Sequence, residues 1–212
     1  MKYDVFDEDY YERGVQTKKS GYQNYSWMPE LTLRMAHYMI QNLNIKDNDK
    51  VLEQGCAKGF LIKALRILGI EAYGFDVSKY SIQNLDNAVK DFCKYSPQGD
   101  IPDFKDKFDW IISKDVMEHL TDEDIEKFLK QAAMISNKIF VVVPLGDNGS
   151  YRISSYHDDI THIQIHDEKG WANIFNQNGW NVNKFSNSMV GIKENWQKAC
   201  TNGNGFFFLT KQ

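Results

Sequence analysis

The sequence has few of the residues that mark several common protein classes. It contains four prolines and three cysteines in 212 residues, and it has no internal repeat. The cysteines, Cys56, Cys93 and Cys200, are odd in number and form no metal-like cluster, which favours free thiols in a reducing compartment. The N-terminal residues lack the apolar core of a signal peptide, and no run approaches the ~18 apolar residues of a membrane span. These absences predict a cytoplasmic protein with no membrane partner.

The sequence also lacks an excess of basic residues. Lys and Arg number 25 against 29 Asp and Glu, so the formal net charge is −4. A mildly acidic chain is poorly suited to phosphate backbones, and the one adjacent basic pair is Lys18-Lys19. A hydrophobic content of 42% indicates a folded chain. We therefore expect no nucleic-acid partner, a monomer or homodimer, and one domain over 29–212 preceded by an N-terminal extension over 1–28.

Helical and strand patterns alternate along the chain. The last strand follows residues 189–202, which are too short and too broken for a helical crossover, so we expect it to be antiparallel. This order predicts an α/β fold, a Rossmann-like doubly wound, mostly parallel seven-stranded sheet with helices on both faces. The expected helices are about 29–43, 60–68, 80–92, 121–136 and 171–178, and the expected strands are 51–53, 71–77, a very short one near 93–100, 108–113, 139–143, 180–185 and 205–210.

The most informative stretch joins the first strand to the next helix. Glu53 ends the strand, and Gly55 and Gly59 follow, where glycine lets the backbone approach a ligand at a helix N-terminus. Asp76 ends the second strand, where a carboxylate can accept both hydroxyls of a ribose. The spacing matches neither a P-loop nor the G-x-G-x-x-G of dehydrogenases, which excludes a nicotinamide oxidoreductase. The combination predicts a nucleoside ligand. The alternatives are an ordinary strand-to-helix turn and a helix-capping Asp76.

Several motifs together resemble a known family. They are EQGCAKG at 53–59, GFDVS at 74–78, QGDI at 98–101 and FDWIISKDVMEHL at 108–120, followed by IFVVVP at 139–144 and DITH at 159–162. In this pattern the chain resembles class I S-adenosylmethionine-dependent methyltransferases over about 29–212, with Ala57 where glycine is commoner. The resemblance implies an acid on the ribose, Asp100 at the adenine amino group and Ile101 against the ring. The implied cofactor-binding set is Glu53, Gly55, Ala57, Gly59, Asp76, Val77, Asp100, Ile101 and Lys114.

Histidines and aspartates gather in the segment 154–171, between the fifth strand and the next helix. Loops at the carboxyl ends of parallel strands bind ligands, and histidine is a suitable base for an acceptor that loses a proton. Following the resemblance, we expect His162 to be the base or the group that orients the acceptor, with Asp159 or Asp158 fixing its tautomer. His119 in the EHL triplet is a second catalytic candidate, beside a packing role. The alternative for His162 is a structural histidine.

A metal ion is a further alternative for this segment. His157, Asp158, His162 and His166 mix imidazoles and carboxylates that suit several divalent ions, but the i, i+4 spacing requires a helix. The intervening isoleucines favour a strand or irregular structure. We therefore expect no bound metal.

The N-terminal extension is expected to fold over the cofactor cleft and to supply contacts to the acceptor. The candidates are Tyr22, Tyr25 and Trp27, together with His157 and Asp158, while Lys18 and Lys19 suit an acceptor phosphate. The alternative is an exposed tail.

The acceptor is expected to be a small molecule. The family's [D/N]-P-P-[Y/F] signature of amino-group acceptors is absent, which favours an oxygen. By analogy with small bacterial family members, we expect a nucleotide-activated sugar or a phosphorylated, phosphoramidate-type precursor of a surface polysaccharide. The alternatives are an N-methyltransferase, an RNA or protein methyltransferase, and a non-catalytic nucleoside-binding module.

Overall fold

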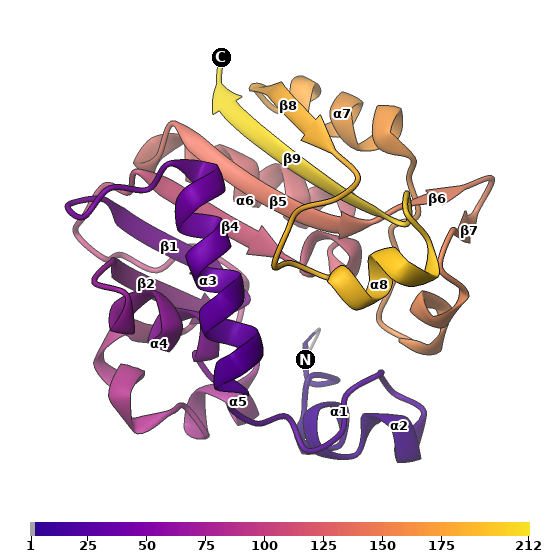
Figure 1. Ribbon diagram of the computed structural model, residues 1–212, viewed down its shortest axis with the longest axis horizontal. Helices are drawn as coiled ribbons and strands as arrows, with labels where there is room; N and C mark the ends of the chain where they lie inside the picture. The colour runs from indigo at the N-terminus through magenta and orange to yellow at the C-terminus, as the bar shows by residue number, and fades with distance from the viewer. Residues whose placement is uncertain (1–2) are drawn as a thin grey trace.

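A computed structural model describes residues 3–212 of the chain (Figure 1). The strands of the main sheet follow the order β3-β2-β1-β4-β5-β9-β8. The helices are α1 (Glu8–Glu12), α2 (Gly14–Thr17), α3 (Pro29–Leu43), α4 (Phe60–Ile67), α5 (Lys79–Gln83), α6 (Asp122–Ile135), α7 (Glu168–Gln177) and α8 (Glu194–Ala199), with 3-10 turns η1 (Asn87–Phe92), η2 (Met117–His119) and η3 (Ser154–Asp158). The strands are β1 (Lys50–Gln54), β2 (Glu71–Asp76), β3 (Cys93–Tyr95), β4 (Trp110–Lys114), β5 (Lys138–Pro144), β6 (Gly146–Asp147), β7 (Ser150–Tyr151), β8 (Trp180–Ser186) and β9 (Asn204–Lys211).

The seven-stranded, mostly parallel sheet confirms the expected fold. β1, β2, β3, β4 and β5 pair in parallel, whereas β9 runs antiparallel to both β5 and β8. Helices α3 and α4 cover one face, and α6 and α7 cover the other (Figure 1). Strand β5 shows the pattern: Phe140 and Val142 pack on the first face and Ile139 and Val141 on the second, all fully buried. A strand buried on both faces needs such a continuous apolar run.

The strand order changes direction between β1 and β4. β1 pairs with β2 on one side and with β4 on the other, and the chain reaches β4 only after forming β2 and β3. In open α/β sheets, ligands bind in the crevice at the carboxyl ends of strands around such a point. Gln54, Asp76 and Lys114 end these three strands and therefore share this edge.

One expected helix is wrong in extent. In place of a continuous helix over 80–92, the chain forms the short helix α5 and then the 3-10 turn η1. Asn84 donates from its side chain to the Tyr80 carbonyl, and the Asp86 carboxylate accepts from the Ala88 amide. Short polar side chains that bond to nearby backbone compete with helix continuation.

Two other regions have more structure than their sequence suggested. Residues 3–28 of the extension contain the helices α1 and α2, and α1 begins where the Asp7 side chain accepts from the Tyr10 amide. The strands β6 and β7 form a small hairpin whose turn places Asn148 and Gly149 at positive φ, as a type I′ turn requires. Among the described residues, no helix combines the length and the apolar character needed to cross a membrane.

Candidate active site

The turn after β1 presses the backbone against neighbouring elements. The Gly55 amide donates to the Phe75 carbonyl at 2.9 Å, which closes the turn onto β2. Gly55 has a φ of 71°, and a Cβ there would lie 2.5 Å from Cγ2 of Val116, so a larger residue would displace that side chain. Ala57 also has a left-handed backbone, with φ of 47°. A residue with a Cβ adopts this conformation at a cost of about 1–2 kcal/mol, so the alanine that departs from the family pattern stands in a strained position.

Asp76 ties the end of β2 to the same turn. Its Oδ2 accepts from the Ala57 amide and its Oδ1 from the Ser78 amide, both at 2.7 Å. Burial raises the pKa of Asp76 to about 6, although the backbone amides act in the opposite direction. A carboxylate has four lone-pair sites, so these amides leave room for a further donor. Asp76 is thus part of the turn and still has acceptor positions, which suits the expected bonds to ribose hydroxyls.

Glu53 is a second buried acid at this edge. Its side chain is 7% exposed, and within the described part of the chain its Oε2 has no hydrogen-bond partner. Burial raises the pKa of Glu53 to about 8; the Lys114 ammonium lowers it and the Asp76 carboxylate raises it. A buried polar atom without a partner is costly, so such an atom at a cavity wall points to a ligand.

A cavity of about 770 Å³ opens at this edge of the sheet. Its size falls within the range of small-molecule sites. The residues expected in the site that do line it are Glu53, Gly55, Ala57, Asp76, Val77, Lys114, His119, Asp159, His162, Tyr22 and Tyr25. The structure therefore places most of both expected groups, cofactor-side and acceptor-side, around a single space.

The N-terminal extension closes one side of the cavity. Tyr11 stacks on Tyr80 at 6.1 Å between ring centroids, and Tyr25 lies 5.3 Å from the ring of Phe60. The Lys58 ammonium fastens the extension to the turn after β1 through the Glu12 carboxylate, at 2.5 Å, and the Tyr25 carbonyl. These contacts place the extension over the turn.

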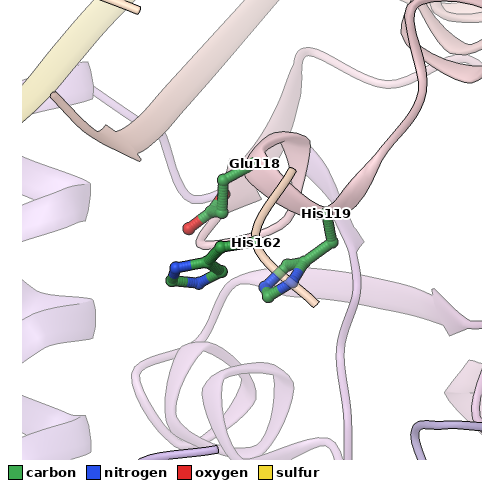
Figure 2. Close-up of side chains that lie close together, drawn as sticks. All are labelled: Glu118, His119 and His162. Atoms are coloured by element: carbon green, nitrogen blue, oxygen red, sulfur yellow. The ribbon is translucent and has the colours of Figure 1, made fainter. Parts of the chain in front are cut away.

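Glu118, His119 and His162, which also line the cavity, form a compact group (Figure 2). One ligand-type atom from each of the three lies within 4.8 Å of the others, and the two imidazole centroids are 4.7 Å apart. Backbone bonds bring the segments together, because the Glu118 carbonyl accepts from the amides of Ile163, at 2.8 Å, and Gln164, at 3.1 Å.

The hydrogen bonds of the two histidines define their tautomers. Nδ1 of His162 lies 2.8 Å from the Tyr156 carbonyl oxygen, which can only accept, so Nδ1 carries the proton. Nδ1 of His119 lies 2.7 Å from the Thr161 hydroxyl, which itself donates to Asp159 at 2.5 Å. The expectation that Asp159 or Asp158 fixes the His162 tautomer is therefore wrong, because the Tyr156 carbonyl does so. Asp159 instead orients His119 through Thr161.

Burial is the main cause of the pKa shifts of Glu118, His119 and His162. It lowers the pKa of His119 to about 4 and that of His162 below its usual value. Burial and the nearby Asp115 raise the pKa of Glu118 to about 8. At neutral pH both imidazoles are uncharged, and each presents an unprotonated Nε2.

Some expected cofactor residues lie elsewhere. Asp100 does not line the cavity, because its side chain bonds to Lys127 and Gln131 of α6, each at 2.7 Å, and Gln98 and Gly99 line the wall instead. Ile101 also lies outside the cavity lining and packs beside α6. Gly59, the N-cap of α4, lies outside the cavity lining and is closely packed, because a Cβ there would lie 2.6 Å from Cγ2 of Val89.

Some expected acceptor residues also lie outside the cavity lining. The ring of Trp27 lies 5.9 Å from that of Phe60, His157 accepts from the Tyr151 amide at 3.1 Å, and Asp158 is exposed. Lys19 pairs with Asp7 at 2.6 Å and so has a partner within the extension. The residues considered for a metal site do not come together, because His166 bonds to Gln164. Among residues 3–212, the side chains that lie close enough to share an ion are Glu118, His119 and His162.

Sequence reasoning missed other residues that line the cavity. Tyr10 donates to Asp159 at 2.7 Å, and Lys193 lies over the ring of Tyr156 at 4.9 Å. Tyr156 stacks on Trp196 at 4.8 Å with an interplanar angle of 8°. The aromatic richness of the first 28 residues was a usable signal for Tyr10, whereas nothing local marks Lys193 or Trp196.

The fold and this edge of the sheet define the class: a doubly wound α/β protein with the fold of class I S-adenosylmethionine-dependent methyltransferases. Residues 22–184 match a family model described as a methyltransferase domain. The chain belongs to this family. The sequence matches none of the curated proteins with which it was compared.

Solved structures agree on the fold. Mitomycin 7-O-methyltransferase is similar with a TM-score of 0.62 and 14% identity, over 94% of this chain and 66% of that one. An S-adenosylmethionine-dependent methyltransferase from Clostridium acetobutylicum has a TM-score of 0.62 and 11% identity, over 84% of this chain and 91% of that one. The magnesium protoporphyrin IX methyltransferase from Synechocystis, solved with bound S-adenosylmethionine, has a TM-score of 0.56 and 15% identity, over 86% of this chain and 79% of that one. The chain thus spans just under two thirds of the mitomycin enzyme and most of the other two.

Proposed function

We propose that this protein transfers the methyl group of S-adenosylmethionine to an oxygen atom of a small polar acceptor. The observation that carries the proposal is that a single cavity is lined both by the buried acids Glu53 and Asp76 and by the histidines His119 and His162. A methyl donor and an acceptor must meet within one enclosed space for an in-line displacement, where positioning dominates catalysis.

The residues around the turn after β1 fit the donor. Asp76 has free acceptor sites for the ribose hydroxyls, and the partnerless Oε2 of Glu53 suits the ammonium of the aminoacyl part. Gly55 lines the cavity, and its lack of a side chain lets Val116 pack against the turn. When bound, S-adenosylmethionine supplies an electrophilic methyl group. The chain's own part is to hold both ends of that molecule and, with the extension, to exclude water.

The two histidines that line the same cavity fit an acceptor that must lose a proton. Nε2 of His162 carries a lone pair because Nδ1 donates to the Tyr156 carbonyl. We propose that this nitrogen orients the acceptor hydroxyl and removes its proton as the oxygen–carbon bond forms. His119 is held by Thr161 in the matching tautomer and supports the same task.

Within this class, we propose a ring-shaped acceptor such as a nucleotide-activated sugar or a phosphorylated precursor of a surface polysaccharide. The parallel rings of Tyr156 and Trp196 line the cavity and support a ring-shaped molecule. The family analogy favours the same substrates.

The first experiment is calorimetry with S-adenosylmethionine, S-adenosylhomocysteine and NAD. We expect the two sulfur nucleosides to bind, NAD not to bind, and Asp76→Ala to abolish most of the binding. Asp91→Ala is the matched control, because Asp91 is exposed. Formation of S-adenosylhomocysteine is then followed with nucleotide sugars, phosphorylated sugars and primary amines as separate acceptor sets.

Two results would contradict the proposal. Failure of both sulfur nucleosides to bind would reject the donor. Turnover with amines alone would reject oxygen as the acceptor atom and favour N-methylation. Binding without turnover on any set would favour a nucleoside-binding module.

A further inference from the structure

We propose that Glu118, His119 and His162 bind a divalent transition-metal ion such as Zn²⁺, Mn²⁺ or Fe²⁺. Two imidazole nitrogens and one carboxylate oxygen form a donor set that such ions favour over Mg²⁺ or Ca²⁺. The proposal revises the expectation that the chain binds no metal and replaces the residues first considered for one.

The three side chains converge on one point. Figure 2 shows the Glu118 carboxyl group and the rings of His119 and His162 close together, and one ligand-type atom from each lies within 4.8 Å of the others. Neighbouring ligands of one ion, each at about 2.1 Å from it, lie about 3 Å apart. Binding therefore requires these atoms to move inward by an ångström or two, which side-chain rotation can supply.

The hydrogen bonds around the histidines are those of metal ligands. A metal-bound histidine usually donates its other ring N–H to a carbonyl, a carboxylate or a water, which fixes the ring and directs its lone pair at the ion. His162 donates from Nδ1 to the Tyr156 carbonyl, at 2.8 Å. His119 donates to Thr161, whose hydroxyl donates in turn to Asp159. Both Nε2 atoms are thereby left with a lone pair for an ion.

The buried carboxyl group is an independent indication. The Glu118 side chain is 1% exposed, and Oε2 has no hydrogen-bond partner among residues 3–212. The nearby ammonium groups of Lys114 and Lys193 are both engaged by the Asp115 carboxylate. A buried carboxyl oxygen left without a donor is costly. An ion between Glu118 and the histidines would satisfy it.

The ion would act on the acceptor. Three protein ligands leave coordination positions open toward the cavity, and a hydroxyl bound there becomes more acidic. Its proton passes to solvent, the oxygen forms a bond to the methyl carbon, and the sulfur–carbon bond breaks with its electron pair staying on sulfur. With an ion bound, the lone pair on Nε2 of His162 is used by the metal, so His162 acts on the acceptor through the ion and is no longer the base itself. This catalytic step rests on the proposed function, but ion binding itself does not.

The test uses the full chain after treatment with a chelator and dialysis. Co²⁺ is titrated and followed by its visible absorption, and Zn²⁺ by calorimetry. We expect one ion per chain and a loss of affinity of about tenfold or more in Glu118→Gln and in His162→Ala. Thr161→Val should weaken binding by about 10–100-fold, because Thr161 only orients a ligand. His37→Ala is the control, since His37 is exposed on α3.

Folding of each variant is checked by thermal melting and by its affinity for S-adenosylhomocysteine, which we expect to be retained. The proposal is overturned if the wild-type chain shows no saturable binding of either ion, or if Glu118→Gln, His162→Ala and Thr161→Val all bind as the control does. Ion binding without binding of the sulfur nucleosides would reject the proposed function and leave the metal site standing. Binding of the sulfur nucleosides without binding of an ion would reject the metal site and leave the proposed function standing.

Discussion

Glu53 should make the protein less stable as the pH rises, and replacing it with glutamine should remove that effect. Its pKa is 4.5 in the unfolded chain and about 8 in the fold. A folded-state pKa raised above the unfolded value means that the folded chain holds the proton more tightly, so stability is highest at low pH and is lost as the pH rises toward 8. The slope is about 1.4 kcal/mol per pH unit between the two values. Between pH 5 and pH 7 the wild type should therefore lose about 2.5 kcal/mol of unfolding free energy through this one group.

The assay is urea unfolding of the wild type and Glu53→Gln at a series of pH values, without cofactor. The quantity to follow is the unfolding free energy of Glu53→Gln minus that of the wild type, in which the effects of other titrating groups cancel. This difference should rise by about 2.5 kcal/mol from pH 5 to pH 7. Glu126→Gln, on the exposed face of α6, should show no such trend. If the unfolding free energies of the wild type and Glu53→Gln changed with pH in parallel, the reasoning would be refuted. The variant should also bind S-adenosylmethionine more weakly, because it lacks the carboxylate for the ammonium group.

Three further predictions concern the same cavity. Asp76→Ala should weaken S-adenosylhomocysteine binding by about 1.5–3 kcal/mol in calorimetry. In the Glu53→Gln variant, which lacks the other titrating acid of the donor site, the Asp76 pKa of about 6 predicts a fall in affinity of about tenfold from pH 7 to pH 5, and a flat profile would count against Asp76 as the ribose ligand. Gly55→Ala should lower the unfolding free energy by about 2 kcal/mol, because residue 55 has a positive φ and an added Cβ would meet Val116. Adding Val116→Ala to that variant should restore part of the loss. Equal melting temperatures for Gly55→Ala and the wild type would contradict this prediction. His162→Ala should leave cofactor affinity unchanged and reduce turnover by roughly 10²–10⁴, whereas His157→Ala, outside the cavity lining, should keep full turnover; unchanged turnover in His162→Ala would make that histidine structural.

The strands of the sheet were predictable because their apolar patterns are local. The run 139–143 indicates a strand buried on both faces, and β5 contains it. The helix expected over 80–92 was wrong because the side chains of Asn84 and Asp86 bond to backbone within the segment. The β6–β7 hairpin was missed although Asn148-Gly149 is a strong turn signal, since strands of two residues have no pattern of their own.

The donor side of the site was more predictable than the acceptor side for a similar reason. Glu53 and Asp76 lie at the carboxyl ends of neighbouring parallel strands, as the penultimate residue of β1 and the last residue of β2, and strand ends follow from the sequence pattern. Asp100 was misplaced because its orientation depends on partners in α6, about 30 residues along the chain. The bond between His119 and Thr161 joins residues 42 apart in sequence, and no local spacing encodes it.

The hydrogen bond from Tyr10 to Asp159 links the extension to the acceptor side of the cavity. Asp159 accepts from Tyr10 through one carboxylate oxygen and from Thr161 through the other, and Thr161 holds His119. If the extension lifts to exchange the nucleoside, the chain from Tyr10 to His119 loses its first member. Nucleoside exchange and the assembly of the histidine pair are then steps of a single cycle: the acceptor end reaches its full hydrogen bonding only while the extension is closed, and an open enzyme presents an incompletely ordered acceptor end.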